Sequence, residues 1–525
     1  MEKIRNEKVP PLVFSTKRML LLGMMILHTV LHAQLIDIRS FGCFAGGAFL
    51  NTKNIQAAID SAARSGGGRV FIPPGTFMTG TIRLCDNVDL YLERGAVLKG
   101  SPHIEDYMLN GRVVGMIFTQ NAKNVSISGF GTIDGNSDAF MDLSRFKTID
   151  NEGKKWTRQK DRFRLADSSG DGPYVPKDRP FQMIIFSDCC NVTVRDVTIL
   201  NSPLWALHFA DCDGVLATKL RIRCDLRVPN NDGIDLTSCS NAIISDCDFR
   251  TGDDCIAITG YQHHHDLPGF KDIPHISENI TVTNCTMVSR SAAIRIGGFD
   301  QNSMRNYVFS NITITHSNRG IGIFARDAGS IENILFTNII IETRLHTGDW
   351  WGQGEPIHIS AVRLTKDVPL GKIKNIQFHN IVCKGESGIL VYGTEENVIE
   401  DVIFRDVQFQ LCAGKQNDIS GGNFDLRPVG DPALQLFAHD IPGLYAQWVK
   451  NLRIDGFNLA WDTVKHTFFT HGIEVGHFTG LHISGYTGAP SPSNPNAVSL
   501  YLHDGKGCDI VRGKNTIRKV NVAGE

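Results

Sequence analysis

Apolar and polar residues alternate along most of the chain in short runs that are separated by single Asn, Asp or Gly positions. Alternation with a period of two is typical of β-strands, and these three residue types supply the bends between strands. The units of this kind begin at Asn124, Asn191, Gly214, Asn241, Asn279, Asn306, Asn333, Asn375, Asp401 and Asn451. The pattern therefore predicts an all-β protein made of many short strands.

The units return at a nearly constant spacing. Those that begin at Asn279, Asn306 and Asn333 are 27 residues apart each time. A unit of this length cannot bury its apolar side alone, so it must stack on its neighbours. An antiparallel sandwich also alternates, but its Asn-Gly or Asp-Gly hairpin signals are few here. We therefore predict a single-stranded right-handed parallel β-helix.

The exceptions to the repeat indicate a cap and three insertions. Residues 54–64 carry the only clear helical periodicity and are expected to form an amphipathic cap before the first rung. Polar interruptions near residues 138–180, 343–356 and 411–445 are expected to lie on one face and to build the binding cleft. We assign residues 34–525 to one catalytic β-helix domain with these insertions.

The first 33 residues have the pattern of a secretory signal peptide. A basic start is followed by an apolar stretch from Met19 to Leu31, and cleavage is expected after Ala33. A membrane anchor is the alternative, but about 13 apolar residues fall short of the roughly 20 that span a bilayer. We predict a secreted or periplasmic protein with no membrane attachment after cleavage.

Charge and cysteine content narrow the possible partners. The 53 basic residues nearly balance the 55 acidic ones, so nothing favours nucleic acid as a partner. The 13 cysteines fall mainly at the turns of strand units, where they are expected to fill the interior, with one or two disulfides left open. We predict a monomer that needs no metal and no cofactor.

Carboxylates gather in one part of the repeat. Asp232 and Asp235 lie in one unit, and Asp253 and Asp254 follow about one rung later. Rungs stack about 4.8 Å apart, so these groups are expected to converge, and like charges then raise at least one pKa. Paired carboxyl groups of unequal pKa are what glycoside hydrolysis needs, whereas a calcium site is the alternative use of such a cluster.

The order of these motifs resembles a known family. The stretch from Asn54 to Ser101, then Asn230-Asn231-Asp232 and Gly252-Asp253-Asp254, is similar to the polygalacturonase-like proteins of glycoside hydrolase family 28 over roughly residues 35–340. The resemblance implies a pectin-lyase-like β-helix and an inverting hydrolase. It also implies that Asp253 is the general acid and that Asp232 and Asp254 together activate the water.

The chain departs from that family pattern in two elements. Ala292 stands where the family has the histidine of a Gly-His-Gly element, and Gly322 and Phe324 occupy the two basic positions of its Arg-Ile-Lys element. Arg295 and Arg326 are therefore our candidates for binding an acidic sugar, because a guanidinium pairs bidentately with a carboxylate.

Further candidates lie in the insertions and on a neighbouring rung. Trp350 and Trp351 are expected to stack on sugar rings, and Glu355 is expected to bind substrate or to act as an acid or base. His208 falls one rung before the aspartates and is a candidate for substrate contact. The run His263 to His265 is expected to be a loop over the cleft, because three consecutive residues cannot all face one metal ion.

Three functions follow as hypotheses. The first is a glycosidase that acts on the ends of an acidic, pectin-like polysaccharide or its oligosaccharides. The second is a calcium-dependent polysaccharide lyase on the same scaffold, with Arg295 as its base. The third is a carbohydrate-binding adhesion solenoid, which requires a run of exposed aromatic residues and no convergent carboxylates.

Overall fold

The computed structural model describes residues 35–146, 170–262, 272–348, 350–511 and 515–524. The predicted signal peptide, the central part of the first insertion and the run His263–His265 lie outside these residues. Within the described ranges no helix is long and apolar enough to cross a membrane.

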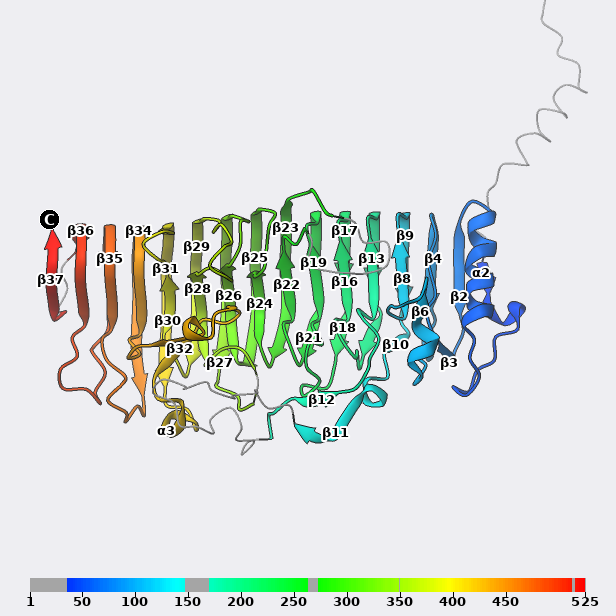
Figure 1. The fold of residues 1–525 in the computed structure, drawn as a ribbon, viewed down its shortest axis with the longest axis horizontal. Helices are drawn as coiled ribbons and strands as arrows, with labels where there is room; N and C mark the ends of the chain where they lie inside the picture. The colour runs from blue at the N-terminus through cyan, green and yellow to red at the C-terminus, as the bar shows by residue number, and fades with distance from the viewer. Residues whose placement is uncertain (1–34, 147–169, 263–271, 349, 512–514, 525) are drawn as a thin grey trace, which may run out of the picture.

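The chain forms a right-handed parallel β-helix, as the repeat predicts, with 31 strands in one continuous hydrogen-bonded system (Figure 1). Three ladders of parallel strands run along its axis. The first ladder carries the acidic cluster at its edge and comprises β8 (Ile117–Gln120), β13 (Ile184–Ser187), β16 (Leu207–Ala210), β19 (Ile234–Thr237), β22 (Ile256–Thr259), β24 (Ala292–Gly297), β26 (Arg319–Ala325), β28 (Glu355–Ala361) and β30 (Ile389–Tyr392).

The other two ladders complete each rung. The second comprises β1 (Leu35–Asp37), β2 (Gly68–Ile72), β4 (Val88–Leu92), β9 (Lys123–Gly129), β14 (Cys190–Arg195), β17 (Asp213–Thr218) and β20 (Ser240–Ser245). The third comprises β3 (Gly75–Thr79), β5 (Ala96–Gly100), β10 (Thr132–Asp134), β15 (Thr198–Leu200), β18 (Arg221–Arg223) and β21 (Asp248–Thr251).

Later rungs are built from longer strands that bend through two or three ladders. These are β23 (Ser277–Ser289), β25 (Met304–Ser317), β27 (Ile331–Thr343), β29 (Ile373–Gly385), β31 (Ile399–Cys412), β34 (Leu444–Asp462), β35 (Ile473–Ser484), β36 (Leu500–Ile510) and β37 (Ile517–Ala523). β37 is the last strand of the stack, at the opposite end from the cap (Figure 1).

Asparagine residues make the bend at the start of each rung. Asn279, Asn306 and Asn333 all have φ near +60°, a left-handed conformation that asparagine tolerates better than most residues. Their side chains also stack, because the amide of Asn306 donates to Asn279 at 3.1 Å and that of Asn333 donates to Asn306 at 3.2 Å. The asparagine that opens each repeat in the sequence therefore both bends the chain and links neighbouring rungs.

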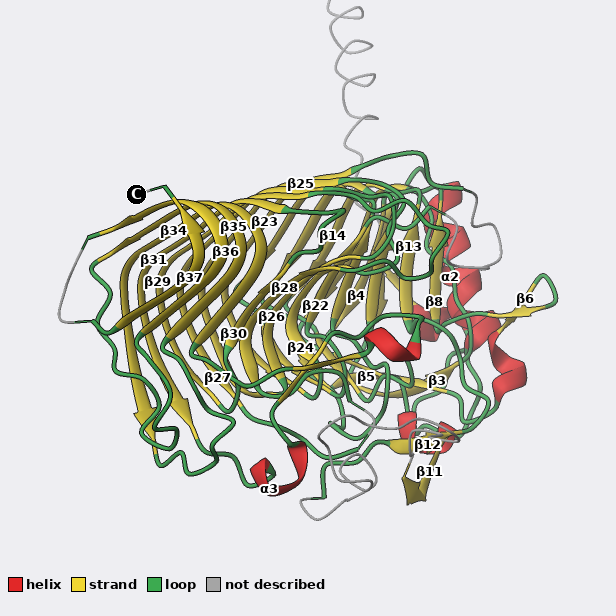
Figure 2. Ribbon diagram, turned by 60° about the vertical axis from the view of Figure 1, so that its left-hand side comes forward, coloured by secondary structure: helices red, strands yellow, loops and turns green. Residues whose placement is uncertain are grey.

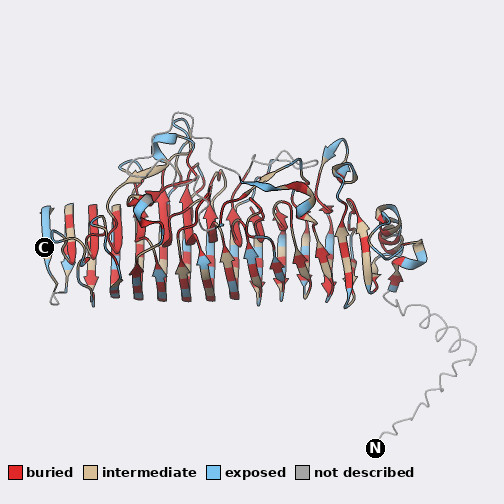
Figure 3. Ribbon diagram, turned by 90° about the horizontal axis from the view of Figure 1, so that it is seen from below, coloured by how far each residue is buried: buried red, intermediate tan, exposed pale blue. Residues whose placement is uncertain are grey.

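The core runs the whole length of the helix. Phe309, Phe336, Phe378 and Phe404 form a buried stack with ring centroids 4.8–5.0 Å apart. All 13 cysteines are unpaired, and most are buried, so the prediction that they fill the interior is confirmed and the disulfides left open are not formed. Figure 3 shows this continuous buried band along the strands.

The cap and the insertions decorate this stack. Helix α2 (Thr52–Arg64) buries Ile55, Ala58, Ile59 and Ala62 at one end of the stack, as its periodicity predicts (Figure 2). Short antiparallel pairs lie outside the rungs, and a short helix, α3 (Asn417–Ser420), lies in the third insertion. The pairs are β6 (Met108–Leu109) with β7 (Arg112–Val113), β11 (Met141–Phe146) with β12 (Tyr174–Pro176), and β32 (Asn423–Asp425) with β33 (Leu436–Ala438).

The described residues also form single turns of 3-10 helix, namely η2 (Ile38–Phe41), η3 (Ile104–Tyr107), η4 (Ser137–Phe140) and η5 (Pro432–Leu434). β11, β12 and α3 lie along one long edge of the stack (Figure 1). This is the edge at which the strands of the first ladder begin.

Candidate active site

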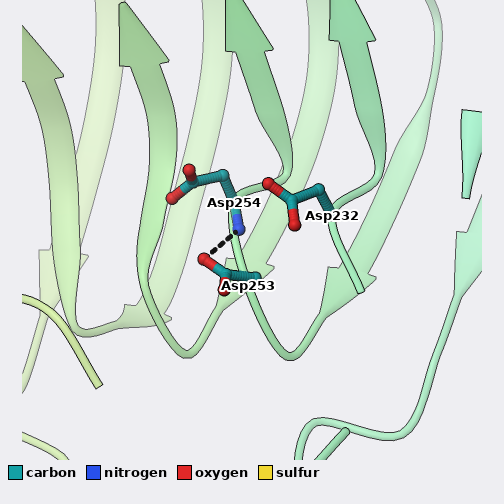
Figure 4. A group of neighbouring side chains, drawn as sticks. All are labelled: Asp232, Asp253 and Asp254. Atoms are coloured by element: carbon teal, nitrogen blue, oxygen red, sulfur yellow. Dashed lines mark hydrogen bonds between the residues drawn. The ribbon is translucent and has the colours of Figure 1, made fainter. Parts of the chain in front are cut away.

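Three aspartates meet at the start of two neighbouring strands of the first ladder. Asp232 precedes β19, and Asp253 and Asp254 precede β22, which pairs directly with β19. One carboxylate oxygen from each of the three lies within 4.8 Å of the other two (Figure 4). Asp253 is the most accessible of the three, because Asp232 and Asp254 are only 3% and 1% exposed. The convergence predicted from the repeat is therefore present.

Arg295 is the cation of this cluster. It lies on β24, the next strand of the ladder, and its Nε donates a hydrogen bond to Asp254. Its Nη2 lies 3.9 Å from Asp232, and Nη1 donates to the carbonyl oxygen of Gly297 at 3.0 Å. Although burial opposes the charge, Tyr261, Asp254 and Asp232 raise the pKa of Arg295 well above its usual value. Arg295 is therefore the cation that pairs with Asp254 and Asp232.

The three aspartates do not share one electrostatic environment. Burial, and then the charge of Asp254, raises the pKa of Asp253 from 3.8 to about 7. Burial also raises the pKa of Asp232 well above its usual range, with the neighbouring carboxylates adding to the effect. Asp254, in contrast, takes hydrogen bonds from Arg295 and from the backbone N–H of Ala292, the latter at 3.0 Å.

A second chain of hydrogen bonds reaches Asp253 from the first insertion. The amide of Asn230 donates to Asp253 Oδ2 at 3.3 Å, and Arg179 Nη2 donates to Asn230 Oδ1 at 2.9 Å. Arg179 Nη1 also donates to the carbonyl oxygens of Pro203 and Pro229, both at 2.7 Å. Arg179 thus fixes the two turns that flank the acidic cluster. It lies in a segment without periodicity, and no sequence signal marked it.

A fourth carboxyl group lies beside the cluster. Asp235 is on β19, paired with His208 on β16, and is 1% exposed. Neither of its oxygens has a hydrogen-bond partner among the described residues, and burial raises its pKa well above the usual range. Ile234 and Leu236 point into the core on either side of it, so strand parity alone indicates that Asp235 faces outward on the catalytic side. The sequence places Asp235 in the same repeat unit as Asp232 but gives no sign of a catalytic or binding role for it.

His208 lies on this face but is fully buried. Its Nε2 is 2.9 Å from the hydroxyl of Thr237, and its ring packs edge-on against Trp205. Its predicted contact with substrate stays a prediction.

Arg326 and Glu355 belong to a separate buried network. We call the network of Arg319, Arg326, Glu355, Asp425 and Arg427 the clamp, because it holds the third insertion against β26 and β28. Arg319 Nε is 2.6 Å from Glu355, and Arg319 Nη2 donates to the carbonyl oxygen of Asp425 at 2.8 Å. Arg326 is completely buried and donates to the backbone carbonyls of Leu426, Pro428 and Ser360.

The charge state of the clamp is also structural. Burial opposes ionisation of Glu355, but Arg319 and His358 outweigh it and lower the pKa of Glu355. Its carboxylate is 1% exposed and is fully engaged by the clamp. The structure therefore brings Asp232, Asp253, Asp254 and Arg295 together, but it places Arg326 and Glu355 apart from them.

The two tryptophans of the second insertion have different surroundings. Trp350 is 2% exposed, and its Nε1 donates to the carbonyl oxygen of Asp171 at 2.7 Å. Trp351 is half-buried. Of the pair, Trp351 is therefore the one with ring surface open to a ligand.

The positions that depart from the family pattern are filled by other groups. Gly322 pairs with Arg295 on the neighbouring strand, and a Cβ on Gly322 would lie 2.6 Å from the ring of Phe324. The ring of Phe324 is in turn covered by Arg319 and Arg326, each about 5 Å from its centroid. An aromatic ring in contact with two clamp arginines thus stands where the resemblance would have supplied a basic pair.

Comparison with known proteins identifies a family and similar folds. The family described as "Glycosyl hydrolases family 28" matches residues 70–421. A probable polygalacturonase of Vitis vinifera is 30% identical over 43% of this chain and 44% of its own length. An exo-poly-alpha-D-galacturonosidase of Dickeya chrysanthemi is 28% identical over 42% and 41%, respectively. The chain thus spans under half the length of these relatives.

Solved structures show the same architecture. A hyperthermoactive exopolygalacturonase from Thermotoga maritima superposes with a TM-score of 0.55 at 21% identity, over 75% of this chain and 91% of its own. A family 28 exopolygalacturonase of Yersinia enterocolitica gives 0.54 at 17% identity, over 94% and 78%. Fold and acidic cluster define a β-helix of the carbohydrate-active class. The family match covers about two thirds of the sequence, and the chain belongs to glycosyl hydrolases family 28.

Proposed function

We propose that this protein hydrolyses O-glycosidic bonds in an acidic, pectin-like polysaccharide or its oligosaccharides. The convergence of Asp232, Asp253 and Asp254 around Arg295 carries this proposal. Unequal environments give the cluster both a proton donor and a proton acceptor, which is what glycoside hydrolysis needs. The family and its named relatives support the same class of substrate.

In the proposed mechanism Asp253 is the general acid. Its raised pKa keeps it protonated near neutral pH, and it is the most accessible of the three, so it can donate a proton to the glycosidic oxygen. Asp232 and Asp254, the latter hydrogen-bonded to Arg295, together activate the attacking water and take up its proton. Attack from the face opposite the leaving group inverts the anomeric centre.

We also propose that the enzyme acts from chain ends and outside the cytoplasm, as a monomer. The insertions gather along the edge where the aspartates lie, which favours a closed pocket over an open groove. Trp351 and Arg295 are our candidates for contacting the sugar. The alternative is the calcium-dependent lyase, in which the three aspartates would hold the ion and Arg295, here paired with Asp254, would be the base.

The test is a defined set of pectic oligosaccharides digested by the purified protein. NMR of the first-formed product is expected to show the inverted anomer, and chromatography is expected to show release of one short product from the start. Asp253→Asn is expected to reduce kcat by about a hundredfold or more. Asp509→Asn is the matched control, since Asp509 is exposed and its one ion pair within the described residues is with His482.

Undiminished turnover by Asp253→Asn on every active substrate would refute the proposed acid. An unsaturated product that absorbs in the ultraviolet would indicate lyase chemistry instead.

A further inference from the structure

A cavity lies on the outer side of the turn at Arg290 and Ser291, which borders the acidic cluster. It has a volume of about 590 Å³, within the range of ligand sites, and is lined by residues of the third ladder and of the turns that follow it. Arg290 contributes to this cavity, while the next residue, Ser291, contributes a side-chain hydrogen bond to Asp253. The cavity and the acidic cluster are therefore separated by one turn of the chain. We call this cavity the basic groove.

The basic groove follows the axis of the β-helix. Arg250 lies on β21, Arg290 directly follows β23, and Arg344 directly follows β27. β21, β23 and β27 belong to the first, second and fourth of four consecutive rungs, and His316 of β25 lines the cavity on the third. The three arginines therefore start from chain positions that span about 14 Å along the axis, at about 4.8 Å per rung. Lys415, from the third insertion, extends the row. A linear ligand along the axis meets a cation on several rungs.

Several of these cations lack a full set of partners. In the part of the chain that the structure describes, neither Arg250 nor Lys415 forms an ion pair, and the buried Nε of Arg290 has no hydrogen-bond partner. Arg290 and Arg344 share a single carboxylate, that of Asp171, at 3.1 Å and 3.0 Å. Glu386 is the one acid in the lining. The groove thus carries an excess of positive charge. The buried N–H at Nε of Arg290 has no acceptor among the described residues.

Part of the lining of the groove, which we call the floor, is apolar. It consists of Leu226, Val288 and Leu345. A hexuronate has a carboxylate and a face of C–H groups, so it matches a surface in which arginines lie beside aliphatic side chains. A simple inorganic anion would use the cations but not the floor.

We propose that the basic groove is a second binding site, separate from the catalytic cluster, for the carboxylates of an acidic polysaccharide. It holds a stretch of polymer against the outer side of the turn while the aspartates act on a chain end. The proposed function enters only in the choice of ligand, because the groove itself is defined by its own charges and shape.

The experiment measures binding where turnover is blocked. Asp253→Asn is titrated with trigalacturonate at low salt by calorimetry, and two binding sites per chain are expected. Adding Arg250→Ala and Lys415→Ala is expected to weaken one of the two sites by about tenfold or more, since each cation lost removes a charge-assisted contact. A neutral trisaccharide is expected not to bind the groove.

The matched control removes two cations elsewhere. Lys53→Ala with Lys366→Ala changes the net charge equally, and both lysines are exposed outside the groove. The control is expected to leave both sites intact, and thermal unfolding confirms that each variant is folded.

A single site in the parent, or equal isotherms for the groove variant and its control, would overturn the inference. Hydrolysis of the same trisaccharide by the unmodified protein is measured separately. Binding that depends on the groove without any hydrolysis would refute the proposed function alone, whereas hydrolysis with groove-independent binding would refute only the second site.

Discussion

At the scale of single residues, the site contains more carboxyl groups than cations. Three carboxyl groups share the immediate influence of one buried guanidinium, that of Arg295. The fourth carboxyl group, Asp235, is buried and has no hydrogen-bond partner among the residues that the structure describes. Because burying several unpaired charges is costly, the cluster retains protons above the pH at which free aspartates lose them. Retained protons are what a general acid requires.

The pH dependence follows from Asp253. Its pKa of about 7 means that the protonated form dominates below neutral pH and is lost above it. We expect kcat/KM to fall as pH rises through about 7, because the proton donor is then ionised. The measurement is the rate of reducing-end release between pH 4 and about pH 9. A rate that stays flat well above neutral pH would assign the acid elsewhere.

Arg179 is expected to position Asp253 without touching substrate. Arg179→Met should lower kcat by about ten- to a hundredfold with little change in KM, because Asn230 loses the group that orients it toward Asp253. The alkaline limb of the pH profile should also move upward, since a cation that favours the carboxylate form is removed.

The control for this variant is Arg145→Met in the same insertion, where Arg145 is exposed and pairs with Asp142. Asn230→Ala should reproduce the effect of Arg179→Met. If Arg179→Met lowers the melting temperature but leaves kcat and the pH limb unchanged, Arg179 is structural only.

At the scale of elements, the clamp decides whether the third insertion stays on the β-helix. Glu355→Gln leaves the buried Arg319 without its charged partner, so we expect a loss of about 3–5 kcal/mol in the free energy of unfolding. Asp248→Asn, which breaks an exposed pair with Arg223, should cost less than about 1 kcal/mol. Denaturant unfolding of both variants measures the difference.

The same pair of variants separates two roles for Glu355. A structural Glu355 predicts a less stable enzyme whose folded fraction still turns over. Full stability with lost turnover would instead make Glu355 part of the chemistry.

The elements divide sharply into those that the sequence predicts and those that it does not. The rungs follow from local information, because Asn279, Asn306 and Asn333 bend the chain at a fixed spacing and the alternation between them sets which side is buried. Convergence of the aspartates follows from the same spacing. The contacts of the insertions do not, since Arg344 and Asp171 are 173 residues apart and no periodic pattern relates them. The same holds for Arg326, Trp350 and Glu355, whose buried partners come from distant segments that no periodic pattern relates to them.

At the scale of the whole molecule, the cysteines act as interior packing. All 13 are unpaired, and only Cys85 and Cys190 are half-buried rather than buried. We expect 13 reactive thiols in denaturant and the same melting temperature with and without reductant. A melting temperature that drops by several degrees in reductant would reveal a disulfide.

The ladders of Asn279, Asn306 and Asn333, and of the stacked phenylalanines, join each rung only to its neighbours. Helix α2 covers one end of the stack. The other end is β37, whose residues are mostly exposed. Opening is expected to start at β37 and to advance rung by rung toward β34, where the clamp ties the third insertion to Arg319 of β26. The catalytic rungs lie far from that end, so the molecule can lose its last turns and still present the same aspartates.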